Sequence, residues 1–108
     1  MIEEAYVTFE TAKLLRNKGF NEITSKSYPV FDNDKFIEDI PCPTLQMAMQ
    51  WLRKMYQIFI QIVPSDGLTK FRATIYYNNT DFIQCNWYFN TPEEVIEDTI
   101  KYCLEHLI

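Results

Sequence analysis

The stretch from Thr44 to Ile108 constrains the fold more than any other part of the chain, because its apolar spacing changes period in a fixed order. Thr44 can cap a helix over 44–56, where apolar residues recur at helical spacing. Alternating apolar and polar residues then predict strands over 58–63, 70–77 and 82–89. The motif Thr91-Pro92-Glu93-Glu94 is a capping box that opens a closing helix over 91–107. This order predicts an antiparallel three-stranded meander.

The first part of the chain is less regular. A helix is predicted over 8–18, capped by Thr8 and ended by Gly19, so that Phe20 can pack back on Leu15. Pro29 cannot donate to a strand ladder, so residues 24–31 are either an edge strand or an extended segment. Asp32-Asn33-Asp34 predicts a turn, and residues 35–43 are expected to be an extended connection.

These elements predict one α+β domain over 1–108, in the order α-(β)-α-β-β-β-α. The meander has three or four strands, the fourth being an edge strand from 24–31, and the helices pack on one face. Ile60 and Trp87 are expected to point toward the helices. The closing helix is expected to bury Ile96, Thr99, Ile100, Cys103 and Leu107, and to expose Glu93, Glu97, Asp98 and Glu105.

Composition indicates the cellular compartment and the classes of partner that the chain is expected to lack. The net charge is −5, which disfavours unaided binding to nucleic acid. Three cysteines without a CxxC spacing indicate reduced thiols in a cytoplasmic compartment. The N-terminus carries acidic residues where a signal peptide has basic ones, and no apolar run approaches the roughly 20 residues that span a bilayer. We therefore expect a cytoplasmic protein without a membrane partner.

Three stretches resemble a family of small proteins encoded by gut anaerobic bacteria and their phages or mobile elements. They are Thr11-Ala12-Lys13-Leu14-Leu15 with Lys18-Gly19-Phe20, the run from Pro43 to Arg53, and the run from Ile100 to Ile108. The family is uncharacterised, so the resemblance implies a biological setting and no activity. The order α-β-β-β-α is also that of double-stranded-RNA-binding domains. Those domains carry lysines where this chain has Glu93 and Glu94, so that activity is rejected.

Residue types that support catalysis are scattered. Cys103 and His106 are three residues apart on the closing helix, and with Cys42 they leave a cysteine-dependent enzyme as an alternative. A thiolate nucleophile needs an electropositive setting, whereas Cys103 falls on the apolar face beside Glu105. No zinc spacing or glycine-rich phosphate loop is present, so no metal or cofactor is expected. The acidic residues Asp32, Asp34, Glu38 and Asp39 are interpreted as a solvated loop.

Two candidate interaction surfaces remain. Met47 and Trp51 lie one helical turn apart, on the flank of the buried stripe. The segment 20–43 either covers them or leaves an aromatic contact of the kind found at interfaces. The second surface is the outward side of the sheet, with Phe59, Tyr76, Phe82 and Tyr88. These four are either cross-strand sheet stabilisers or a contact surface.

The sequence therefore predicts a small non-catalytic protein-interaction module, and the resemblance implies that it is an accessory protein of a phage or mobile element. The alternatives are the cysteine-dependent enzyme and a weak single-stranded nucleic-acid binder that uses the aromatic sheet face. Its partners are an unidentified protein or a second copy of the chain. The expected homodimer pairs the sheet faces across a two-fold axis, with the Trp51 flank as second choice.

Overall fold

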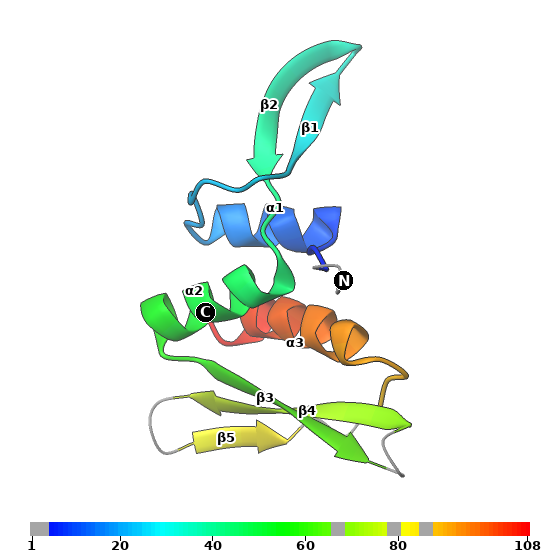
Figure 1. Cartoon of the computed structure of the whole chain (residues 1–108). Coiled ribbons are helices and arrows are strands. Elements are labelled where there is room, and N and C mark those ends of the chain that lie inside the picture. The colour runs from blue at the N-terminus through cyan, green and yellow to red at the C-terminus, as the bar shows by residue number, and fades with distance from the viewer. Residues whose placement is uncertain (1–4, 66–68, 78–80, 85–87) are drawn as a thin grey trace.

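The chain forms a three-stranded sheet covered on one side by helices, with a separate hairpin at the far end. A computed structural model describes residues 5–65, 69–77, 81–84 and 88–108. The elements are α1 (Phe9–Asn17), β1 (Ser27–Asp32), β2 (Lys35–Pro41), α2 (Leu45–Tyr56), β3 (Phe59–Ser65), β4 (Lys70–Tyr77), β5 (Asp81–Gln84) and α3 (Pro92–His106). The sheet order is β3-β4-β5, antiparallel throughout, and all three helices lie on one side of it (Figure 1). The predicted α+β meander is confirmed.

Local capping chemistry fixes the helix ends where the sequence predicts them. The Thr8 side chain accepts from the Thr11 backbone N–H at the start of α1. At its end Gly19 adopts a φ of 104°, which is the left-handed conformation that glycine tolerates. The Phe20 N–H then donates to the Leu15 carbonyl at 2.9 Å and the Gly19 N–H to Arg16 at 3.0 Å. This is the predicted Schellman ending.

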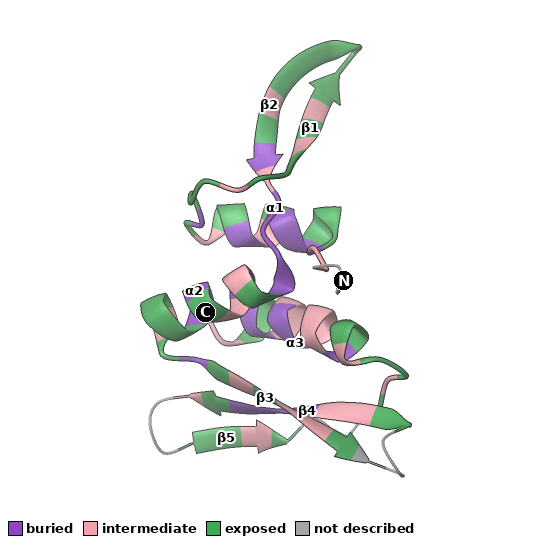
Figure 2. Ribbon diagram, viewed as in Figure 1, coloured by how far each residue is buried: buried purple, intermediate pink, exposed green. Residues whose placement is uncertain are grey.

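The core lies where α3 packs between the other helices and the sheet (Figure 2). Ala73 and Ile75 of β4 are fully buried on the side that α3 covers. α3 itself buries Val95, Thr99, Ile100, Cys103 and Leu104. Thr99, Ile100 and Cys103 agree with the prediction, whereas Ile96 and Leu107 are only half-buried. Val95 and Leu104 are buried in place of Ile96 and Leu107, because α3 contacts the other helices as well as the sheet.

The structure corrects the prediction for residues 24–43. Residues 35–41 are not an extended connection but a strand, and β1 pairs with it rather than with the edge of the meander. Asn33 and Asp34 have φ values of 50° and 64°, which is the signature of a two-residue type I′ hairpin turn. An ion pair between Arg16 and Glu38 joins the hairpin to α1, and the Tyr28 hydroxyl donates to the carbonyl of Val7, just before α1, at 2.9 Å.

The sheet register agrees with the predicted inward and outward sets. Phe59 pairs with Tyr76, and Tyr76 pairs with Phe82 on its other side. Phe71 forms an isolated bridge with Phe89 farther along. The side chain of Trp87, predicted to point inward, lies outside the described residues. Among the described helices, none is long and apolar enough to cross a membrane.

Candidate interaction surface

The three described helices lie on one side of the sheet, so no described helix covers its outward side (Figure 1). The register places Phe59, Tyr76 and Phe82 beside one another on three adjacent strands. Their exposed fractions are 49%, 44% and 61%. The Tyr76 and Phe82 rings are 6.1 Å apart between centroids, which is contact distance for aromatic pairs. We call these three residues the aromatic row.

Polar groups border the aromatic row. The Tyr76 hydroxyl donates to Gln61 Oε1 at 3.1 Å, which orients the central ring. In the next rank of the sheet Thr74 is buried between Gln61 and Gln84, so the two exposed glutamines supply the polar groups there. An apolar strip beside hydrogen-bonding groups is the composition of a protein contact surface.

Tyr88, the fourth predicted member of this surface, lies apart from the row. Because Phe71 pairs with Phe89, Tyr88 lies next to Arg72. Arg72 is four residues from Tyr76 along β4. At about 3.3 Å per strand residue, that separation is roughly 13 Å. Tyr88 is half-exposed and can enlarge the surface, but it does not touch the aromatic row.

The Trp51 flank is not an exposed surface. Trp51 is only 5% exposed, and its ring lies edge-on between those of Phe20 and Tyr56, with centroid distances of 5.5 Å and 5.3 Å. Phe20 belongs to the 20–43 segment, so this segment covers Trp51, which is the first of the two alternatives that the sequence leaves open. Met47 is half-buried. Met55, whose helical spacing from Leu52 predicts burial, is 55% exposed.

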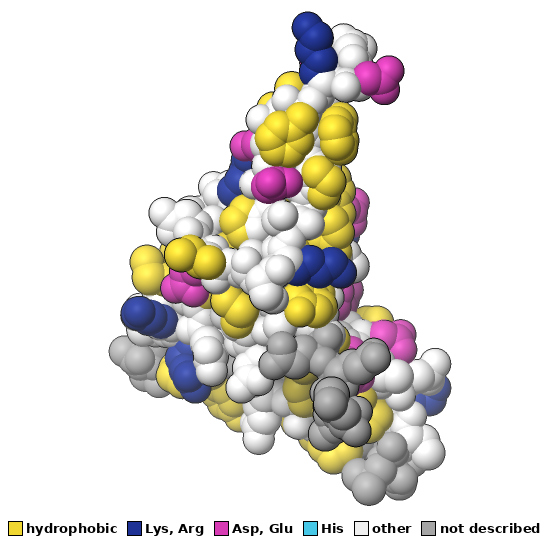
Figure 3. All heavy atoms as spheres, turned by 45° about the horizontal axis from the view of Figure 1, so that its top comes forward, with side chains coloured by type: hydrophobic (Ala, Val, Ile, Leu, Met, Phe, Trp, Pro, Cys, Tyr) yellow, Lys and Arg dark blue, Asp and Glu magenta, His cyan; other side chains and the backbone are white. Residues whose placement is uncertain are grey.

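The hairpin presents an exposed apolar surface that the sequence did not predict. Phe31 and Phe36 pair across its strands with centroids 6.0 Å apart, and both are exposed, as is Ile37. Figure 3 shows hydrophobic side chains along the hairpin, with basic and acidic side chains at its far end. The signal that could have revealed this surface is the pair Asn33–Asp34, which favours a two-residue hairpin turn.

The cysteines do not form a catalytic pair with His106. Cys42 and Cys103 are both fully buried, whereas His106 is exposed and its ring contacts Tyr102. Burial raises the pKa of the Cys42 thiol, although the neighbouring Tyr28 hydroxyl acts in the opposite direction. Burial, and then the Cys42 thiol, raise the pKa of Tyr28. A raised pKa keeps Cys42 protonated at neutral pH, which disfavours nucleophilic chemistry.

We expect Cys42 and Cys103 to be inert toward iodoacetamide in the folded protein near neutral pH. Reaction should be about 100-fold or more slower than in urea, because each thiol must first be exposed by unfolding. The measurement uses a Cys85→Ser variant, so that only these two thiols report. A thiol that reacts as fast folded as unfolded would instead support the cysteine-dependent enzyme.

The acidic residues of the hairpin do not assemble into a metal site. Within the described ranges, no three His, Cys, Asp or Glu side chains lie close enough to hold an ion. Glu38 is engaged by Arg16.

Comparison with protein-family models, curated proteins and solved structures finds no match to this chain.

Proposed function

We propose that this protein is a small non-catalytic interaction module whose contact surface is the aromatic row. The observation that carries the proposal is the arrangement of Phe59, Tyr76 and Phe82, which lie side by side and partly exposed on the uncovered side of the sheet. Cross-strand aromatic pairs also stabilise sheets, but that role leaves about half of each ring in water. Covering the row would remove this apolar area from water and stabilise a complex.

The setting is part of the same proposal. We place the protein in the cytoplasm as an accessory factor of a phage or mobile element. This rests on the resemblance of three stretches of the chain, which include the cap and buried face of α2, and on the buried, protonated Cys42 thiol.

A second copy of the chain is the partner that we propose for the aromatic row. Tyr76 is the central member, flanked by Phe59 and Phe82. A two-fold axis running along β4 above Tyr76 would place Phe59 of one copy over Phe82 of the other. The row is then complementary to itself, which is the condition for an isologous dimer.

Sedimentation of the wild type at about 50 μM, in the range where weak dimers assemble, tests this proposal. We expect a dimer, and we expect the double variant Tyr76→Glu with Phe82→Glu to be monomeric because it buries two charges in the interface. Phe31→Glu with Phe36→Glu is the matched control, since it alters an exposed cross-strand aromatic pair at the same spacing on the hairpin. This control should remain dimeric.

Two outcomes would contradict the dimer. A monomeric wild type at this concentration removes the second copy as the partner. A dimer that survives the sheet substitutions but dissociates in the hairpin variant moves the interface to Phe31 and Phe36.

Single-stranded nucleic acid is the second candidate occupant of the aromatic row. The described outward residues of β3, β4 and β5 include Lys70 and Arg72 but no acidic residue, although the chain as a whole is acidic. Stacking on exposed rings beside such cations is how sequence-tolerant single-strand binding works. Lys70 donates to Asn90 Oδ1 at 2.7 Å, so its charge is already partly engaged. Titration of a fluorescent oligothymidylate at low salt distinguishes this candidate from the dimer.

A further inference from the structure

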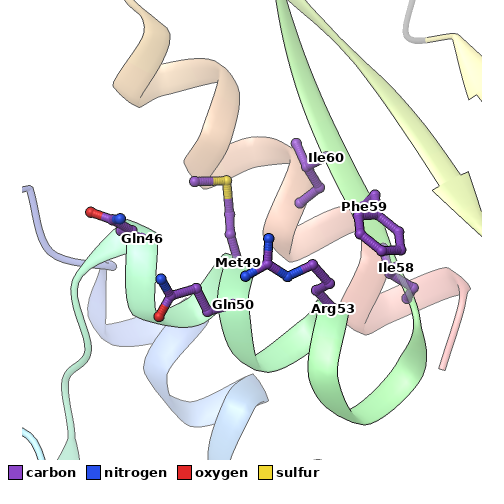
Figure 4. A pocket seen from close by; sticks show the side chains of 7 residues that line it. All are labelled: Gln46, Met49, Gln50, Arg53, Ile58, Phe59 and Ile60. Atoms are coloured by element: carbon purple, nitrogen blue, oxygen red, sulfur yellow. The ribbon is translucent and has the colours of Figure 1, made fainter.

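A groove separates α2 from β3 and shares one residue, Phe59, with the aromatic row. Its volume is about 210 Å³, and Gln46, Met49, Gln50, Arg53, Ile58, Phe59 and Ile60 line it. In Figure 4, Met49 and Arg53 extend from α2 and Ile60 extends from β3 into the space between them. Because β3 is an edge strand of the sheet, one wall of this groove is an open strand edge.

The hydrogen-bonding direction of β3 follows from the pairing of its neighbour. Phe71 and Phe89 exchange both backbone hydrogen bonds, each at 2.8 Å, so odd-numbered residues of β4 bond toward β5. Even-numbered residues of β4 therefore bond toward β3, where Arg72 pairs with Val63 and Thr74 with Gln61. It follows that the backbone groups of the even-numbered residues of β3 point to the open edge.

Two residues supply free backbone groups on that edge. Ile60 and Ile62 each direct an N–H and a carbonyl outward, where no described residue pairs with them. The preceding even-numbered residue, Ile58, also directs its N–H away from β4 and donates it to the Leu52 carbonyl at 3.2 Å. Pro64 fits the same pattern, because proline within a strand is tolerated where its nitrogen faces an open edge.

The opposite wall of the groove, formed by α2, is basic and polar. Arg53 is exposed on α2, and none of the described acidic side chains forms an ion pair with it. Gln46 and Gln50 precede it on the same helix and offer amide donors and acceptors. Met49 and Ile60 provide the apolar floor. No acidic residue lines the groove, although the chain has a net charge of −5.

We propose that this groove binds an extended segment of a partner protein, which adds to β3 as a fourth strand and places an acidic side chain on Arg53. Main-chain bonds to Ile60 and Ile62 supply affinity, and alternate side chains enter the groove against Met49, as in other strand-addition complexes. The carboxylate of the segment meets the guanidinium of Arg53, which is a charge-assisted contact. Phe59 belongs to both the groove and the aromatic row, but strand addition uses the backbone of Ile60 and Ile62 and does not depend on the function of the row.

The chemistry of the groove favours a peptide over a second copy of the chain. If two copies paired through β3, each Arg53 would meet the segment from Phe59 to Ser65, which contains no acidic residue. Pro64 also ends the run of free N–H donors after Ile62, so the edge offers a ladder only a few residues long. A ladder of this length is enough to bind a short peptide segment, but it buries less area than a stable dimer needs.

Selection of a phage-displayed library of random linear peptides on the immobilised full chain tests the proposal. We expect the selected peptides to carry an aspartate or glutamate among alternating apolar residues. Arg53→Glu should weaken the binding of the selected peptides by about 10- to 100-fold, the range expected for one charge-assisted hydrogen bond. Ile62→Pro should abolish binding because it removes an edge N–H while leaving the bonds to β4 intact. The matched control Ile62→Val retains that N–H and should bind as the wild type does.

Amide hydrogen exchange supplies a readout that does not depend on the proline variant folding. The amides of Ile60 and Ile62 should exchange rapidly in the free protein and become protected when a selected peptide is bound. The double variant Tyr76→Glu with Phe82→Glu should still bind the peptide, which separates this site from the aromatic row.

Several outcomes would overturn the proposal. One is a selection that enriches no acidic, alternating peptide, and another is a set of peptides that bind Arg53→Glu as tightly as the wild type. Unchanged exchange at Ile60 and Ile62 on binding would also exclude strand addition. A wild-type dimer that dissociates in Ile62→Pro would assign the edge to a second copy instead.

Discussion

Replacement of Trp51 by alanine is expected to lower the free energy of unfolding by about 3–5 kcal/mol. Trp51 is 5% exposed, and its ring packs edge-on against Phe20 and Tyr56. Truncation removes the largest side chain of this cluster and leaves a cavity that the rigid helix cannot fill. Since small domains are stable by only about 5–15 kcal/mol, the variant should unfold at much lower urea concentration.

Met55→Ala is the control for this measurement, because Met55 lies on the same helix but is exposed. Its effect should stay within about 0.5 kcal/mol. Urea unfolding followed by circular dichroism gives both values. If Trp51→Ala costs less than about 1 kcal/mol, Phe20 does not cover the indole, and the Trp51 flank again becomes a candidate contact surface.

Replacement of Glu97 by alanine is expected to cost about 1–3 kcal/mol, which is large for a glutamate on a helix. Glu97 Oε1 accepts from the Thr8 N–H at 3.0 Å, the Thr8 hydroxyl at 2.6 Å and the Thr11 hydroxyl at 2.7 Å. These bonds join α3 to the start of α1, where the helix dipole also stabilises the negative charge of Glu97. Without the carboxylate, the fully buried Thr11 hydroxyl loses an acceptor.

Two further substitutions make the Glu97 experiment specific. Glu97→Gln retains an oxygen acceptor at the same place and should recover part of the lost stability. Glu105→Ala removes an exposed acid from the same helix and should change the unfolding free energy by less than about 0.5 kcal/mol. Equal effects of Glu97→Ala and Glu105→Ala in thermal or urea unfolding would mean that the bonds to Thr8 and Thr11 contribute little.

The elements that were predicted well are those fixed by neighbouring residues. Thr8, Thr44 and Thr91 cap the three helices by accepting from a backbone N–H three residues ahead. The alternation over residues 70–77 gives the bounds of β4 as the structure has them. Caps and alternation act over a few residues, so their signals are complete within a short stretch of sequence.

The hairpin was missed because its alternation is interrupted. Phe36 and Ile37 are consecutive apolar residues, and the register shifts at this point because Val30 pairs with Glu38 whereas Phe31 pairs with Phe36. The strand therefore lacks the period of two that identifies β4. The bonds of Glu97 were missed for a different reason, since its partners lie 86 and 89 residues away and leave no local trace.

The candidate surface was predictable in composition but not in shape. Alternation placed Phe59, Tyr76, Phe82 and Tyr88 on the outward side of the sheet, and the structure describes all four as exposed. Which of them touch depends on the pairing register, which brings three together and leaves Tyr88 apart. The free edge of β3 likewise follows only from the pairing of β4 with its other neighbour.

Nuclear Overhauser contacts between isotopically distinct copies show whether the aromatic row mediates association. A mixture of labelled and unlabelled chains reports only contacts that cross the interface. We predict such contacts among the ring protons of Phe59, Tyr76 and Phe82. Association through the aromatic row would be ruled out if no contact between copies appeared at about 50 μM. Contacts confined to Phe31 and Phe36 of the hairpin would also rule it out.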